Sequence, residues 1–183
     1  MNKLKNTAKP SGFTLIELLI VIAILGVLAV VVLVAINPVQ QLARTRDSGR
    51  KSAITQLGRA LQAYYTARNG TYVTENATWL DSLVTSGELA SAPSAISYAS
   101  GNAGCSGAAE QNNLCYDYDT TLGRVIVYAR MESNVEASKC ATGTVAYFVY
   151  SSRQGRGGLV CSASAPTAAT DGTTGGWTWN SVQ

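Results

Sequence analysis

The clearest pattern in the chain is an apolar run from Phe13 to Ile36, which only one Thr, one Glu and one Gly interrupt. A helix rises about 1.5 Å per residue, so a helix over this run reaches about 36 Å, enough to cross a membrane once. The run exceeds the apolar core of about 7 to 15 residues that is usual in a secretory signal peptide, and no convincing small-x-small cleavage site follows it. We therefore predict a membrane-spanning helix over residues 13–36.

Beyond Asn37-Pro38 the apolar positions recur at three- and four-residue spacing, which predicts an amphipathic helix over residues 37–70. Its stripe consists of Ile54, Leu57, Leu61 and Tyr64. Asn69-Gly70 is a stop signal, because glycine just beyond a helix can take the left-handed conformation that closes the last turn. We expect one long helix with two chemical halves, the second of which carries a folded domain on its stripe.

Residues 71–183 are expected to form one extracytoplasmic α/β domain with a loop-rich, flexible C-terminal tail. Thr78 to Val84 predicts a short helix, and the small, polar composition of 94–113 predicts a surface loop. Runs rich in Val, Ile, Tyr and Phe predict about four strands, over 115–119, 124–131, 143–151 and 158–161. The fold class is thus α+β, with a small antiparallel sheet packed on the helix stripe. In the tail, Trp177 and Trp179 either dock on the sheet or expose an adhesive surface.

Glu17 is a single carboxylate inside the apolar run, and such a charge usually has a partner, because its insertion into hydrocarbon costs about 2.5 to 3.5 kcal/mol. An ordinary membrane anchor leaves this residue unexplained. The segment Gly12-Phe13-Thr14-Leu15-Ile16-Glu17 follows a short leader that contains Lys3, Lys5 and Lys9, and it precedes Gly26. In these features the chain resembles type IV pilins and the related pseudopilins, which carry a class III prepilin signal.

The resemblance implies that prepilin peptidase removes the leader, residues 1–12, by cutting between Gly12 and Phe13, and that the new amino group of Phe13 is methylated. It implies that Glu17 accepts the charged amine of a neighbouring subunit in a helical homo-oligomer. Loss of one member of a buried charge pair costs about 3 to 5 kcal/mol, so the assignment is physically consistent. The family has a lollipop shape, and an assembly platform and an ATPase build its filaments.

The same resemblance implies a single pass in the cytoplasmic membrane before assembly, then an extracellular pilus or an envelope pseudopilus. We favour a pilin of a type IV pilus; a pseudopilin of type II secretion or DNA uptake is the alternative. A membrane-tethered extracellular binding protein or enzyme is a third reading, although no nucleophile, base and orienter stand at telling spacings. We therefore expect no enzymatic activity and no cofactor.

Gly26 and Pro38 bound a segment for which the sequence allows either a bent helix or an interrupted one. A helix-interior proline loses one hydrogen bond and clashes with the preceding turn, so it bends or interrupts the helix. The family commonly has proline at the position of Val34, and here it falls one turn later, after an apparent insertion. The resemblance implies that the segment between that glycine and proline can melt in the filament, and a simple kink is the alternative.

The net charge of the chain limits the kinds of partner that it is expected to bind. Removal of the three leader lysines takes Lys plus Arg from 14 to 11 against 11 acidic residues, so the mature chain is formally neutral and a whole-domain nucleic-acid ligand is not expected. A local basic cluster remains. It contains Arg44, Arg46, Arg50 and Lys51, opposed only by Asp47. We expect this cluster to be a solvated helix face or to contact lipid headgroups and neighbouring subunits.

Four cysteines lie in the part that the topology places outside the cytoplasm, where disulfides persist. Three connectivities are possible, and we favour the sequence neighbours, Cys105 with Cys115 and Cys140 with Cys161. The chain has no His, which excludes any histidine-based triad or metal site. Asp117 and Asp119 are weak calcium candidates without EF-hand spacing, and no other metal ligands are expected.

Two triplets fit the N-glycosylation pattern, Asn69-Gly70-Thr71 and Asn76-Ala77-Thr78. Such triplets often arise by chance.

Overall fold

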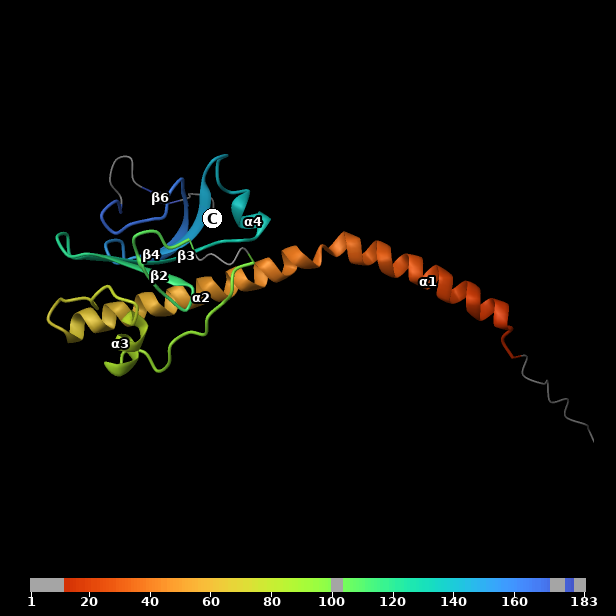
Figure 1. Cartoon of the computed structure of the whole chain (residues 1–183), viewed down its shortest axis with the longest axis horizontal. Coiled ribbons are helices and arrows are strands. Elements are labelled where there is room, and N and C mark those ends of the chain that lie inside the picture. The colour runs from red at the N-terminus through yellow and green to blue at the C-terminus, as the bar shows by residue number, and fades with distance from the viewer. Residues whose placement is uncertain (1–11, 100–103, 172–176, 180–183) are drawn as a thin grey trace, which may run out of the picture. The chain divides into compact units, whose positions relative to one another are not determined.

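The computed structural model describes residues 12–99, 104–171 and 177–179. The chain divides into two compact units, one ending at Val39 and the other beginning at Gln40 (Figure 1). The leader residues 1–11, on which part of the predicted signal falls, lie outside the described residues.

The first unit contains helix α1, Leu15–Ile36. Thr14 is its N-cap, and Asn37 ends it in the left-handed conformation, with φ 46°. No side chain of α1 is buried. In the part of the chain that the structure describes, one helical stretch, beginning at Leu15, is long and apolar enough to cross a membrane.

Helix α2, Pro38–Ala67, begins with proline, which fits a first helical position because its missing N–H would have no partner there. The stripe residues Ile54, Leu57 and Leu61 are fully buried, as the spacing predicted. The predicted stop is also confirmed, since the N–H of Gly70 bonds to the carbonyl of Tyr65 at 2.9 Å and Gly70 has φ 79°.

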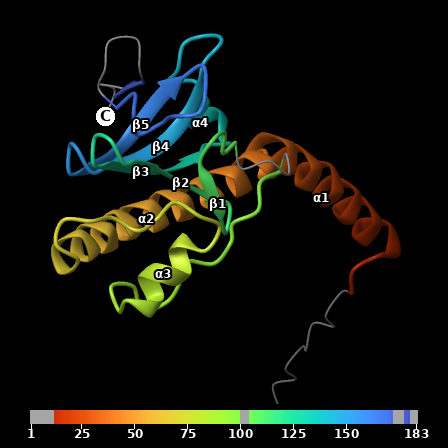
Figure 2. The same cartoon turned by 60° about the vertical axis from the view of Figure 1, so that its left-hand side comes forward.

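The second unit also contains a six-stranded sheet in which each strand pairs antiparallel with the next along the chain. The strands are β1 (Ala109–Gln111), β2 (Leu114–Asp119), β3 (Arg124–Arg130), β4 (Val145–Ser151), β5 (Arg156–Ser162) and β6 (Thr178–Trp179). Two short helices complete the unit, α3 (Trp79–Thr85) and α4 (Asn134–Ala137). Figure 2 shows α2 along one face of the sheet, and α3 lies beside it and contacts β1 and β2.

Both faces of the sheet are covered, because successive strand residues point to opposite sides. One hydrophobic cluster joins the α2 stripe to Val125, Val127 and Ala129 of β3. The other contains Ile126 and Tyr128 of β3 together with Ala168 and Trp177. The predicted α+β class, with a helix stripe packed on an antiparallel sheet, is therefore confirmed.

The sheet has two strands more than expected. β1 lies inside the stretch 94–113 that was expected to be loop, and a two-residue turn of Asn112 and Asn113, with φ 54° and 61°, returns the chain to β2. β6 brings the tail back onto β5, where Trp179 pairs with Val160. Trp177 is buried, and its indole N–H donates to the carbonyl of Thr167 at 3.0 Å, so the tail tryptophans dock on the sheet.

Candidate assembly site

Glu17 and Thr14 form a reciprocal cap at the start of α1. The backbone N–H of Thr14 donates to Glu17 Oε2 at 2.8 Å, and the Thr14 hydroxyl donates to the same oxygen at 2.7 Å. In return, the Glu17 N–H donates to Thr14 Oγ1 at 3.3 Å. This is a capping box, which satisfies donors that a helix start leaves without intrahelical partners. Glu17 Oε1 accepts no bond from any described residue, so the carboxylate can take a further donor.

Phe13 precedes this cap and is 91% exposed. Because Gly12 and Phe13 lie before the first helical residue, the bond between them is in non-helical backbone. Helical backbone would need to unwind before a peptidase could bind it in extended form, whereas this bond lies outside the α1 hydrogen-bond ladder.

Beyond Glu17, the α1 surface is apolar around its whole circumference, and no other described part of the chain buries it. Its large side chains are 50% or more exposed, from Leu15 at 84% to Ile36 at 53%. Soluble monomers rarely expose apolar patches larger than a few hundred Å², and larger ones mark membrane or protein contacts. This surface therefore needs a lipid or protein environment.

The structure places Gly26 inside α1 with regular helix on both sides, and the interruption lies at Asn37, immediately before Pro38. A Cβ added to Gly26 would meet nothing within 4 Å. The helix is thus interrupted at Asn37, next to the proline, and melting in a filament stays a prediction.

A buried ionic cluster fixes α2 to the domain. Arg50 donates to Asp47 at 3.0 Å and to Glu132 at 2.8 Å, and its guanidinium lies 3.7 Å from the ring centroid of Tyr98. The Asp47 carboxylate also accepts the backbone N–H groups of Glu132 and Ser133, at 2.9 and 2.8 Å. Asp47 and Arg50 are 2% and 1% exposed. These contacts join one turn of α2 to the segment after β3.

The cluster shifts two pKa values. Burial by itself would raise the pKa of the Glu132 carboxyl, but bonds from the Ala99 N–H, Arg50 and Arg46 outweigh it, and the pKa is lowered. Burial raises the pKa of Tyr98 to about 12. Glu132 therefore carries its negative charge against the two arginines.

The expectation of a solvated basic face is wrong for three of its four cations. Arg46 binds Glu132 at 3.0 Å, Arg50 is buried, and Lys51 binds Glu136 at 2.7 Å. Only Arg44 is exposed and lacks a carboxylate partner among the described residues. Apart from Asp47, the carboxylates that pair with this cluster, Glu132 and Glu136, lie more than 80 residues along the chain, so no local pattern in the sequence predicts them.

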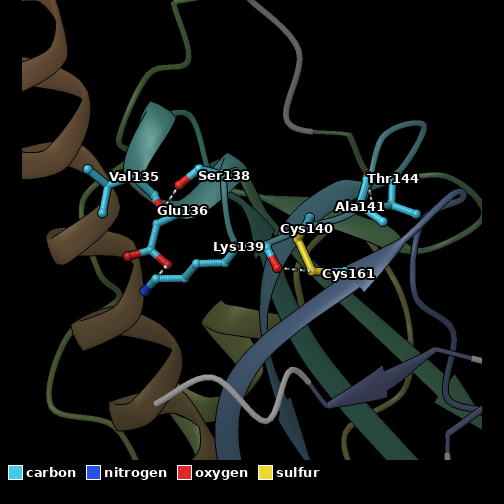
Figure 3. The surroundings of a disulfide bond; sticks show 8 residues. All are labelled: Val135, Glu136, Ser138, Lys139, Cys140, Ala141, Thr144 and Cys161. Carbon is cyan, nitrogen blue, oxygen red and sulfur yellow. Dashed lines mark hydrogen bonds and ion pairs between the residues drawn. A yellow bond between two sulfur atoms is a disulfide. The ribbon is translucent and has the colours of Figure 1, made fainter.

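The Cys140–Cys161 disulfide ties the end of the α4 region to β5 (Figure 3). Beside it, Lys139 reaches back to Glu136 at 3.1 Å, and the same Glu136 binds Lys51 of α2. Burial opposes ionisation of the Glu136 carboxyl, but its bonds to Lys51 and Lys139 outweigh burial and lower its pKa. The disulfide and the ion pairs together connect β5, α4 and α2.

The second disulfide, Cys105–Cys115, joins the segment before β1 to β2. Both bridges join the cysteine neighbours in sequence, which is the connectivity favoured above. The described residues contain no free cysteine.

The weak calcium candidates bind protein groups. Asp117 Oδ2 accepts the N–H of Ala168 at 2.5 Å, and Asp119 Oδ1 accepts the N–H groups of Thr121 and Leu122 at 2.9 and 3.0 Å. Among the residues that the structure describes, no group of three or more His, Cys, Asp or Glu side chains is placed to hold a metal ion. These two aspartates therefore fix a tail segment and the β2–β3 turn.

Residues 8–33 match the family model of the prokaryotic N-terminal methylation motif. Comparisons with curated proteins and with solved structures gave no match. The matched segment contains Gly12, Phe13, the Thr14–Glu17 cap and most of α1. The chain thus carries the class III prepilin signal of type IV pilins and pseudopilins at the start of its apolar helix.

Proposed function

We propose that the chain is a structural subunit of a type IV pilus, a pilin that prepilin peptidase cuts after Gly12 and that assembles through α1. Methylation of Phe13, insertion by an assembly platform and work by an ATPase are parts of this proposal. Repeated heterologous contacts along a screw axis give an open filament, and an apolar helix supplies a continuous core for it.

The observation that carries the proposal is the uncovered apolar surface of α1 directly behind the prepilin signal. Before assembly, the lipid of the cytoplasmic membrane would cover it. After extraction from the membrane, the same helix of neighbouring subunits would offer an equal apolar surface. A tethered enzyme needs the membrane-spanning length, and Glu17 would serve it only as the helix cap with Thr14.

The charge of Glu17 supplies an electrostatic driving force for assembly. The Thr14 cap satisfies one carboxylate oxygen within the chain and leaves Oε1 open. The amine of Phe13 in a neighbouring subunit is a cation that could bind there, in a low-dielectric core where a charge-assisted bond is strong. In this proposal each added subunit neutralises one otherwise uncompensated charge.

Between the two systems we favour the pilus over a pseudopilus of type II secretion or DNA uptake. Two disulfides strengthen a domain that is rich in loops, which suits a filament exposed outside the cell. A pseudopilin remains the second candidate, since the prepilin signal is common to both.

Substitution of Glu17 tests the proposal. Glu17→Ala should leave leader removal and membrane insertion intact and abolish filaments, whereas Glu88→Ala, a change on the domain, should leave filaments intact. Leader removal is read by mass spectrometry of the membrane fraction, and filaments by shearing and immunoblotting. Normal filament yield from Glu17→Ala would contradict the proposal, and an uncut leader on a surface-displayed wild-type domain would favour the tethered protein.

A further inference from the structure

The segment between α2 and α3 carries two Asn-x-Thr triplets that the assembly role does not use. They are Asn69-Gly70-Thr71 and Asn76-Ala77-Thr78, and all six residues are exposed. Such a triplet is the acceptor pattern for N-linked glycans in surface loops of exported proteins. The side chains of the two asparagines differ in their hydrogen bonds, and this difference distinguishes the triplets.

Asn76 is held in a side-chain turn with its own threonine. Asn76 Oδ1 accepts the N–H of Thr78 at 2.9 Å and the hydroxyl of Thr78 at 3.0 Å. This is an Asx turn, in which the side chain mimics a backbone carbonyl. The amide nitrogen Nδ2 donates to no described residue and lies on an exposed side chain, so an incoming group can reach it.

The loop is anchored directly behind this turn. Trp79 is fully buried, and its ring lies 4.8 Å from that of Tyr116, centroid to centroid. The backbone N–H of Trp79 also donates to the carbonyl of Asn76 at 3.4 Å. The asparagine is therefore presented at the surface from a fixed base.

Asn69 has a different environment. It is in the left-handed conformation at the end of α2, with φ 51°, and the N–H of Thr71 bonds to the carbonyl of Arg68 at 3.2 Å. No hydrogen bond joins the side chains of Asn69 and Thr71. The two triplets are thus equal in pattern and exposure and unequal in geometry.

We propose that Asn76 is an N-glycosylation site and that Asn69 is not modified. The donor is a polyprenyl-diphosphate-linked oligosaccharide outside the cytoplasm. Two donors on Oδ1 stabilise negative charge on that oxygen as Nδ2 loses a proton, which makes the nitrogen a better nucleophile. Nδ2 forms a bond to the anomeric carbon of the sugar, the bond from that carbon to the diphosphate oxygen breaks, and its electron pair leaves with the lipid diphosphate. The Nδ2 proton passes to a base of the transferase.

This inference rests on the extracytoplasmic placement of the domain in the proposed function. Two features of the purified protein report that placement independently, namely a chain that begins at Phe13 and oxidised Cys105–Cys115 and Cys140–Cys161 bridges. Failure of the glycan site and failure of the placement can therefore be distinguished in one sample.

The experiment is glycopeptide mass spectrometry on the full chain purified from its own cells. Trypsin leaves both triplets in one peptide, because no Lys or Arg lies between Arg68 and Arg124, and added chymotrypsin separates them by cutting after Tyr72. Thr78→Val removes the hydroxyl of the Asn76 triplet, and Thr71→Val is the matched control. Glycan is expected on Asn76 in the wild type and in Thr71→Val, and its loss is expected in Thr78→Val.

An unmodified Asn76 in a processed chain with both bridges oxidised would overturn the glycan site and leave the proposed function standing. Glycan on Asn69 alone, or glycan on Asn76 that persists in Thr78→Val, would overturn it as well. An intact leader with free thiols would overturn the placement and the glycan site together.

Discussion

Gly58 of α2 lies directly against the ring of Tyr150 in β4. A Cβ at position 58 would lie 2.3 Å from Tyr150 Cδ2, and three ring atoms would be within 2.5 Å. No real side chain tolerates such a contact, so the absence of a side chain at Gly58 sets how closely the helix approaches the sheet.

Gly58→Ala should therefore destabilise the domain although alanine is the better helix former. Overpacking lowers the free energy of unfolding by about 1 to 3 kcal/mol. The higher helix propensity of alanine offsets about 1 kcal/mol of this loss. Urea unfolding of the detergent-solubilised chain should show a net loss of up to about 2 kcal/mol. Gly49→Ala is the matched control, since its Cβ would meet only the Cδ1 end of Ile96, at 2.8 Å, which can move. Equal midpoints for the two variants would contradict the packing.

Asp47→Ala should be among the most destabilising single changes in the domain. It removes the acceptor of two backbone N–H groups and leaves Arg50 with only the Glu132 carboxylate. Loss of one partner of a buried charge pair costs about 3 to 5 kcal/mol, and the unfolding midpoint measures it. Glu110→Ala, at an exposed carboxylate of β1, should change stability by less than about 0.5 kcal/mol. A loss for Asp47→Ala no larger than that would show that the cluster contributes little.

Glu136 should make stability depend on pH. Its folded-state pKa lies below the ordinary 4.5, so its contribution is present above 4.5 and is lost as pH falls through the folded pKa. Glu136→Gln should be less stable than the wild type near neutral pH, and the gap should close on acidification. Glu75 has the opposite sign, because burial raises its pKa; relative to Glu75→Gln, the wild type should gain stability as pH falls. Parallel pH profiles for the two comparisons would contradict these assignments.

Each disulfide should contribute to the free energy of unfolding, and the bridge with the longer loop should contribute slightly more. Cys140–Cys161 closes a separation of 21 residues and Cys105–Cys115 one of 10. Loop entropy assigns about 3 kcal/mol to each bridge, with about 0.6 kcal/mol more for the longer loop. Paired Cys-to-Ala variants, compared by urea unfolding, measure both losses. A negligible loss for either pair would mean that its loop is already ordered in the unfolded chain.

The sequence predicted the elements whose signals are local. The apolar run, the stop at Asn69-Gly70 and the strands rich in Val, Ile and Tyr all follow from spacing and residue type. β1 was missed because its own residues, Ala109 to Gln111, carry no strand preference and pair only because β2 lies opposite. The Asn112-Asn113 pair was the available signal, since two left-handed residues favour a tight hairpin turn.

The buried Asp47–Arg50 pair could not be found in this way. Charged residues at helical spacing predict a solvated face. The groups that contact this pair are distant in sequence: Glu132 and Ser133, more than 80 residues away, and, for Arg50, also the segment from Ile96 to Tyr98. The Thr14–Glu17 cap was also missed, although the Thr-x-x-Glu spacing at the start of an apolar run is the sequence signal of a capping box. The charge of Glu17 by itself does not reveal this local partner.

As a pilin, this chain would be cut after Gly12 and built into a surface filament through α1. Mass spectrometry of filaments sheared from the cells tests both steps. We predict that they contain this chain, beginning at a methylated Phe13. A chain that still carries residues 1–12, or a mature chain confined to the cell envelope and absent from sheared filaments, would contradict the claim, the second result favouring a pseudopilus.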